Sequence, residues 1–252
     1  MKISAGKKMT VRIHLVRHGL SESNLDLSIN RRKPDHAIEL ASKGEAQALF
    51  AGKELAKILN AVPGFQRKRL RMLVSPYQRT RQTAAGVGEG LTRSGYDFQM
   101  HESLQLREQS FGLFDGIPDD ELAAHYPAEH SHYAKHVAFE GEFFAPLPLG
   151  ESRAQVCDRV RSTFDSIQRE MRGDSPVTDT IVISHGVTIR CFLKEWLHLP
   201  WEWCERQPNP SNCSITTIEG KPGQGWKSSL TFEGFEHTRE TNQDRREEGH
   251  LA

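Results

Sequence analysis

The sequence predicts an α/β fold in which helices cover both faces of a mostly parallel sheet. Short apolar stretches rich in β-branched residues alternate with amphipathic helical stretches along most of the chain, a pattern typical of strand–helix units. Residues 180–183 are all β-branched and indicate a strand buried within the sheet. Three strand-like stretches end directly before polar segments, at residues 17–19, 75–79 and 184–186. Because ligands bind at the carboxyl ends of strands in such sheets, these segments predict the functional site.

Composition argues against several classes of protein. The 252 residues are 37% hydrophobic and 26% charged, and 33 basic residues balance 33 acidic ones, so neither a nucleic acid nor a membrane surface is an expected partner. No apolar run approaches the roughly 20 residues that span a bilayer. The first ten residues carry three lysines with no apolar segment after them, so we expect no secretory signal and a cytoplasmic location. The four cysteines are then expected to be reduced.

The first hundred residues predict three strands and two helices. Residues 11–16 alternate apolar and polar, residues 70–74 form a second apolar run, and residues 96–101 could form an edge strand. Residues 42–45 match a capping box, so we expect a helix to start there. A second helix should open at Arg79 and fray where three glycines follow one another at every second position, at Gly86, Gly88 and Gly90.

The remainder predicts an inserted lid and then a return to the sheet. Residues 102–150 are irregular, which is typical of a functional insertion, and we expect one short helix there, at residues 119–125. Helices are predicted over 151–172 and 187–199, with strands at 180–183, 215–218 and 229–232. We therefore expect one domain over residues 1–232, with its lid, and a charged, mobile tail over 233–252.

The polar strand ends suggest phosphate chemistry. Arg17 offers a planar fork of donors that fits two phosphate oxygens, and the imidazole of His18 could attack phosphorus. On this segment alone, a basic turn with a surface histidine is an equally good interpretation. If the three strands are parallel neighbours, however, His18 and His185 converge on one crevice with Arg17 and Arg79.

Five motifs in a fixed order resemble the histidine phosphatase superfamily, also called phosphoglycerate mutase-like. They are Arg-His-Gly-x-Ser-x-x-Asn at 17–24, Ser-Pro-x-x-Arg-x-x-Gln-Thr-Ala at 75–84, Arg-Glu-x-x-Phe-Gly at 107–112, Gly-Glu-Ser at 150–152 and Ser-His-Gly at 184–186. The resemblance covers residues 11 to about 219 and leaves the C-terminal tail outside. It implies a three-layer α/β/α sandwich with a mostly parallel central sheet and an inserted lid.

The resemblance also implies a role for each residue of the site, with no metal and no cofactor. His18 would be the nucleophile that takes the phosphoryl group, and Glu108 would protonate the leaving oxygen. Arg17, Arg79, Asn24 and His185 would bind the phosphate oxygens. Four convergent donors could supply the positioning and charge stabilisation that phosphoryl transfer needs.

Several other residues have plainer interpretations. Histidines 125, 130, 132 and 136 could suggest a metal cluster, yet no acidic or cysteine partner has a defined spacing there, so a solvated lid is favoured and substrate contact stays open. Arg81 lies off the motif spacing that selects Arg79. Arg107 is expected at the surface or behind the site, and His14 is expected to be structural.

The sequence favours a phosphatase over a mutase. A mutase must hold a phosphoglycerate and needs extra cations in the lid, but residues 109–150 contain only Lys135 as a fixed cation. Ser184-His185-Gly186-Val187 also stands where mutases of the superfamily usually have Ala-His-Gly-Asn. A phosphoglycerate mutase and a non-catalytic phospholigand-binding module remain the alternatives. The expected substrate is a small phosphorylated molecule, with a phosphopeptide and a homodimer left open.

Overall fold

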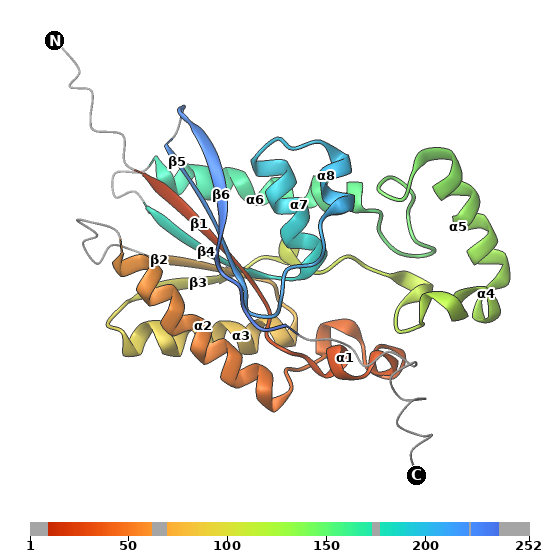
Figure 1. Cartoon of the computed structure of the whole chain (residues 1–252), viewed down its shortest axis with the longest axis horizontal. Coiled ribbons are helices and arrows are strands. Elements are labelled where there is room, and N and C mark those ends of the chain that lie inside the picture. Colours follow the sequence, from red (N-terminus) through yellow and green to blue (C-terminus); the bar gives the residue numbers. More distant parts are fainter. Residues whose placement is uncertain (1–9, 62–69, 173–176, 222, 237–252) are drawn as a thin grey trace.

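The computed structural model describes residues 10–61, 70–172, 177–221 and 223–236 of the chain (Figure 1). Its strands are β1 (Val11–Arg17), β2 (Leu70–Val74), β3 (Phe98–Glu102), β4 (Asp179–Ser184), β5 (Ile215–Lys221) and β6 (Gly225–Phe232). Its α-helices are α1 (Glu22–Leu25), α2 (Ser42–Asn60), α3 (Gln78–Arg93), α4 (Leu122–His125), α5 (Pro127–Glu140), α6 (Arg153–Met171), α7 (Gly186–Trp196) and α8 (Trp201–Arg206). Short 3₁₀ turns connect several of them.

The six strands form one mixed sheet in the order β3-β2-β4-β1-β5-β6. The first four run parallel to one another, whereas β5 is antiparallel to both β1 and β6. Strand β4 is buried along its whole length, as expected for a strand between parallel neighbours. The predicted α/β/α architecture with a mostly parallel sheet is confirmed.

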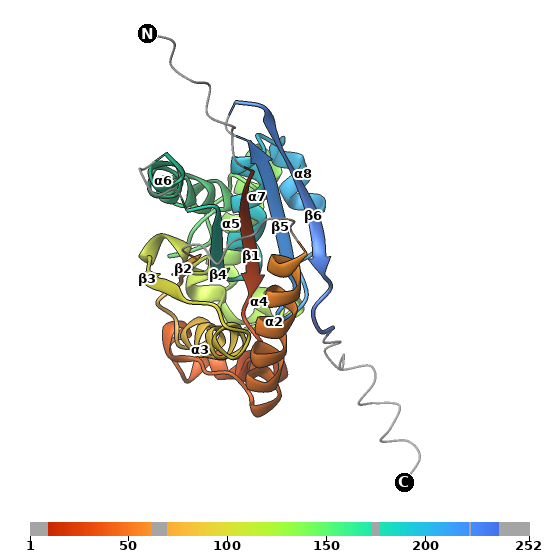
Figure 2. The ribbon, with the colours of Figure 1, turned by 90° about the vertical axis from the view of Figure 1, so that its left-hand side faces the viewer.

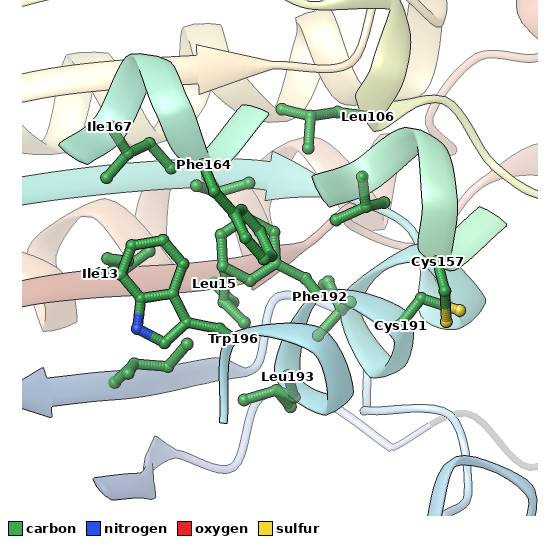
Figure 3. Close-up of a cluster of buried hydrophobic side chains, with 14 of the residues drawn as sticks. Ile13, Leu15, Leu106, Cys157, Phe164, Ile167, Cys191, Phe192, Leu193 and Trp196 are labelled. Carbon is green, nitrogen blue, oxygen red and sulfur yellow. The ribbon is translucent and has the colours of Figure 1, made fainter. Parts of the chain in front are cut away.

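Two hydrophobic cores hold helices against opposite faces of the sheet (Figures 1 and 2). On one face, Ile13 and Leu15 of β1 pack with Phe164 of α6 and with Phe192 and Trp196 of α7 (Figure 3). On the other face, α2 and α3 pack on alternate residues of β2 and β4. Burial of aliphatic and aromatic side chains on both faces thus fixes the layers, at roughly 1.5–3 kcal/mol for each fully buried side chain.

Helix α3 continues through the three glycines at which fraying was expected, so that prediction was wrong. A Cβ atom on Gly90 would lie 2.8 Å from the backbone of Gly52 in α2, and one on Gly86 would lie 2.7 Å from Cβ of Ala48. The glycines therefore let the two helix backbones approach closely. The packing offsets the roughly 1 kcal/mol that each glycine costs in a helix.

The capping box predicted at Ser42 is not formed. Ala41 is the N-cap of α2 and gives no side-chain cap, because the helix begins one residue earlier than expected. Gly44 then lies against the backbone of Leu20, at a distance that no Cβ atom would allow. Two capping boxes do form elsewhere, from Ser21 to the start of α1 and from Ser152 to the start of α6.

The lid contains more helix than the sequence indicated. The short helix expected at residues 119–125 is present as a 3₁₀ turn followed by α4, but α5 and the later α8 were missed. Helix α5 has no fully buried residue, so its sequence lacks the apolar periodicity that normally identifies a helix. It lies off the end of the sheet where β1 ends (Figure 1).

The packed structure continues a little past residue 232. Phe235 donates its backbone N–H to Asn212 O at 2.8 Å, and its ring lies 5.8 Å from that of Phe50. Residues 237–252, which make up most of the expected mobile tail, lie outside the described part of the chain.

Candidate active site

Neighbouring parallel strands bring the two histidines together. Arg17 and Ser184 are register partners at the ends of β1 and β4, so His18 and His185 follow at the same edge of the sheet. The His18 N–H donates to Ser184 O at 3.0 Å. The two imidazole rings lie 5.3 Å apart, centroid to centroid, at an angle of 61°. That separation leaves both rings within reach of one phosphate-sized group.

His18 is held as a neutral imidazole in which one ring nitrogen is bound to the backbone. Its Nδ1 lies 2.8 Å from Gly19 O, and since a carbonyl oxygen only accepts, Nδ1 carries the proton and Nε2 keeps the lone pair. Burial lowers the pKa of His18 well below its usual 6.5, and the charges of Arg79 and Arg17 lower it further. The ring is therefore neutral at neutral pH, with a proton on Nδ1 and none on Nε2.

His185 is anchored through one nitrogen only. Its Nε2 lies 2.8 Å from Ser75 Oγ at the end of β2, and the Tyr77 ring packs edge-on at 5.1 Å. Its Nδ1 is buried and has no hydrogen-bond partner in the part of the chain that the structure describes. Burial, followed by the charge of Arg79, lowers the pKa of His185 well below its usual value. The unsatisfied Nδ1 is the atom of this ring left for a ligand.

The two arginines are positioned by backbone oxygens. Arg17 donates from Nη1 to Pro210 O at 2.6 Å. Arg79, at the first turn of α3, donates from Nη1 to Asp35 O and to Asp35 Oδ1, both at 2.7 Å. Its guanidinium carbon lies 5.2 Å from the centre of the Tyr77 ring. Both arginines line the same cavity as His18. Arg81 instead pairs with Glu102 at the surface.

Asn24 reaches the cavity from the first turn of α1. Its Oδ1 accepts from Ser21 N at 3.1 Å in the capping box and from Asn212 Nδ2 at 3.2 Å. With the carbonyl oxygen engaged on both sides, the amide nitrogen is the donor end of this side chain.

Glu108 lies in the loop after the 3₁₀ turn at residues 104–106, next to the first turn of α7. Its Oε1 accepts from Gln109 N at 3.0 Å and from Thr188 N at 3.3 Å. Thr188 also donates its hydroxyl to Arg107 O at 2.7 Å. No described residue donates to Oε2 within hydrogen-bonding distance, and the side chain lines the cavity. One carboxylate oxygen is thus fixed by backbone donors, while the other has no donor among the described residues.

A partly buried ion pair holds the loop that carries Glu108. Arg159 on α6 donates from Nη2 to Glu108 O at 2.9 Å and from Nη1 to Arg107 O at 2.9 Å, while its Nε pairs with Glu151 at 2.9 Å. Glu151 also accepts from Ser110 N at 3.0 Å and pairs with Arg107 at 2.6 Å. Burial raises the pKa of Glu151, but the hydrogen bond from Arg159 and the positive charge of Arg159 outweigh burial, so the pKa is lowered. This is the structural role of the Gly-Glu-Ser segment.

The cavity has a volume of about 680 Å³ and two unlike walls. The strand-end wall consists of Arg17, His18, Asn24 and Arg79. The lid wall, contributed by residues 111–147 with Arg153 of α6, includes Phe114, Asp115, Asp119, Tyr133 and Glu142. Glu108 lies in the loop between them. The structure thus brings five of the six expected site residues to this cavity, whereas the sixth, His185, is fully buried and does not line it, although its ring lies 5.3 Å from that of His18.

Sequence reasoning missed several residues of this site. Asp35 was given no role, yet it holds Arg79; Ser75 was quoted in a motif without a role, yet it anchors His185. The available sequence signal was Pro34, which precedes the short 3₁₀ turn that begins at Asp35 and could have indicated an ordered loop there. Of the four lid histidines, only His130 lines the cavity, and no group of three or more metal-binding side chains occurs among the described residues.

Residues 13–232 match the family profile described as "Histidine phosphatase superfamily (branch 1)". The chain belongs to the histidine phosphatase superfamily. This histidine phosphatase chain is 35% identical to the phosphoglycerate mutase-like protein AT74 of Arabidopsis thaliana, over 93% of its own length and 71% of the relative's. It is 24% identical to the broad-range acid phosphatase DET1 of Saccharomyces cerevisiae, over 82% and 84% of the two chains.

Solved structures show the same fold. A mycobacterial glucosyl-3-phosphoglycerate phosphatase superposes with a TM-score of 0.64 at 23% identity, over 87% of this chain and 98% of that one. A mycobacterial hydrolase superposes with a TM-score of 0.66 at 22% identity, over 96% and 97%. In this histidine phosphatase, no helix of the described residues is long and apolar enough to cross a membrane.

Proposed function

We propose that this protein is a phosphomonoesterase that works through a phosphohistidine on His18 and needs no metal ion. The observation that supports this best is the state of His18: buried, neutral, with Nδ1 bound and the Nε2 lone pair unprotonated beside two arginines. A neutral imidazole can attack phosphorus without first losing a proton.

In the first step, Nε2 of His18 attacks phosphorus as the bond to the ester oxygen breaks. Arg17, Arg79 and the amide of Asn24 hold the non-bridging oxygens, and Nδ1 of His185 donates to them in the tautomer whose Nε2 accepts from Ser75. Glu108 gives its proton to the leaving alkoxide. The developing negative charge on the oxygens is thus stabilised by groups already fixed in place.

In the second step, water attacks phosphorus while the nitrogen–phosphorus bond breaks. Glu108, now a carboxylate, takes the proton of the water, and His18 returns to its neutral state. The products are the free alcohol and inorganic phosphate. The cations at the reacting end supply the charge stabilisation that Mg²⁺ gives other phosphoryl-transfer enzymes.

A phosphatase fits this cavity better than a phosphoglycerate mutase. Among the described residues that line the lid wall, Arg153 carries the one guanidinium, and it already pairs with Glu142 at 2.6 Å. A mutase must retain a second acidic group of its substrate between two transfers, and that group would need an available cation. Similarity to an acid phosphatase and to a glucosyl-3-phosphoglycerate phosphatase supports the same assignment.

The test is to trap the phosphoenzyme. Wild-type protein is mixed with radiolabelled substrate in the presence of EDTA and quenched within milliseconds. We expect an acid-labile, alkali-stable label, which marks a phosphoramidate, and we expect none with His18→Ala. The variant His14→Gln is less suitable as a control because His14 is buried against Asp179; His101→Gln on the edge strand is suitable. A label that survives in His18→Ala, or that requires a divalent ion, would contradict the proposal.

A further inference from the structure

The lid wall of the cavity is acidic. Asp115, Asp119 and Glu142 line it, and among the described lining residues Arg153 is the only fixed cation outside the strand-end wall. Arg153 itself lies between two carboxylates, with Glu142 at 2.6 Å and Glu205 at 3.8 Å. The cation that could receive a second acidic group of a substrate is therefore already neutralised.

The negative charge extends toward the phosphate-binding end. Asp115 accepts from Asn30 Nδ2 at 2.7 Å, and the turn that follows it packs closely on residues 30 and 31, which fixes this carboxylate in the wall. Burial raises the pKa of Asp115, and the nearby charge of Asp35 raises it further. A second anion bound here would meet the same unfavourable surroundings as the carboxylate itself.

Apart from His130, the remaining lid-wall surface is aromatic and aliphatic. Phe114 and Tyr133 pack edge to face, with ring centroids 5.7 Å apart, and Leu122 belongs to the same small cluster. Carboxylate oxygens accept hydrogen bonds from hydroxyl groups, while aromatic faces cover the C–H surfaces between them. Such a wall suits an alcohol with several hydroxyl groups.

We propose that the cavity selects phosphomonoesters of neutral, hydroxylated alcohols, such as polyol and sugar phosphates, and discriminates against esters that carry a second acid. This inference rests on the proposed phosphatase function, since it concerns the leaving group of that reaction. Selectivity arises because the phosphate is bound by the strand-end arginines in every case, whereas a further carboxylate would face Asp115 and Asp119.

Two matched pairs of compounds test the proposal on the wild-type protein. Glycerol 3-phosphate and 3-phosphoglycerate differ only in a hydroxymethyl group replaced by a carboxylate, and glucitol 6-phosphate and 6-phosphogluconate offer a longer pair with the same difference. Each is used as a competitor of p-nitrophenyl phosphate hydrolysis. We expect the inhibition constant of the neutral member to be lower by on the order of tenfold.

Variants locate the effect. Asp115→Asn removes one negative charge from the lid wall and should reduce the preference by roughly threefold or more. Asp120→Asn removes the same charge from an exposed position of the same lid turn that does not line the cavity, and it should keep the wild-type preference. If Asp115→Asn does not fold, the competition experiment on the wild-type protein still tests whether the cavity prefers neutral esters.

The outcomes separate this inference from the function on which it rests. Absence of p-nitrophenyl phosphate hydrolysis and of a phosphoenzyme would remove the proposed function. Hydrolysis through a phosphoenzyme with equal inhibition by both members of each pair, with stronger inhibition by the acids, or with no inhibition by any of them would overturn the inference and leave the function standing.

Discussion

The two walls of the cavity differ in how firmly the fold holds them. His18 and Arg79 of the strand-end wall are each 4% exposed, and backbone oxygens bind both. In the lid wall, Asp119 is exposed, the Glu142 side chain is 52% exposed, and helix α5 has no fully buried residue. The strand ends are fixed by a sheet buried on both faces, whereas the lid packs through a small apolar cluster of its own and joins the main core through Phe143.

This difference separates chemistry from selectivity. Groups that must stabilise charge on phosphorus need fixed positions, and the strand ends provide them. Groups that meet the variable alcohol can lie on a surface that tolerates change. We therefore expect substitutions near phosphorus to lower turnover of every substrate, and substitutions in the lid wall to change the relative rates among substrates.

The largest effect is expected from the proton donor. Glu108→Gln keeps the shape of a protonated acid but has no transferable proton, so the first transfer from alkyl esters should slow by about 10²–10⁴-fold. Aryl esters should slow far less, because an aryl oxide leaves without protonation. A rapid-quench burst measures this step alone. Glu121→Gln, in the exposed part of the lid, serves as the control. Equal slowing of alkyl and aryl esters would mean that an acid other than Glu108 protonates the leaving oxygen.

A matched pair of arginines compares the two walls directly. Arg79→Lys keeps the charge but loses the planar fork, so kcat/KM should fall by on the order of 10²-fold for all substrates. For Arg153→Lys, the fall in kcat/KM should be roughly tenfold smaller, and its size should depend on the alcohol part of the substrate. The measurement is kcat/KM for p-nitrophenyl phosphate and glycerol 3-phosphate with each variant. Equal losses would mean that both walls bind the phosphoryl group.

A smaller effect is expected from the loop that carries Glu108. Glu151→Gln weakens the pairs with Arg159 and Arg107 and lets the Glu108 loop move, while the cavity keeps its lining residues. We expect about a tenfold loss on alkyl esters, a smaller loss on aryl esters, and roughly 1–3 kcal/mol less stability toward urea. Loss of stability without the alkyl–aryl contrast would show that Glu151 supports the fold and does not position the acid.

The smallest effect concerns stability against pH. The pKa values of His18 and His185 are lowered in the folded protein, so the unfolded chain takes up protons first as the pH falls through the ordinary value of 6.5. The free energy of unfolding should therefore be unaffected by these groups above that pH. It should fall by roughly 1–2 kcal/mol between about pH 6.5 and about pH 5.5. Urea titrations of wild type, His18→Ala and the surface control His101→Gln measure this. A pH dependence unchanged in His18→Ala would show that His18 is not buried in its neutral form.

Much of the site was predictable because it lies at strand ends. Strand periodicity located β1, β2 and β4, and the polar residues after them in sequence identified His18, Arg79 and His185. The order of five motifs then identified the superfamily and added Asn24 and Glu108. Helix α5 of the lid escaped this reasoning, since it has too little buried surface to produce an apolar period.

The sequence by itself determined the alternation of strands and helices, the family and the candidate site residues, because each depends on local patterns of a few residues. Only the tertiary structure decided that the glycines of α3 serve close packing against α2, that Asp35 holds Arg79 and that Glu151 and Arg159 hold the Glu108 loop. It also decided that the lid wall is acidic. These are contacts between residues distant in the chain, and the charge of a cavity wall depends on which side chains the fold places together.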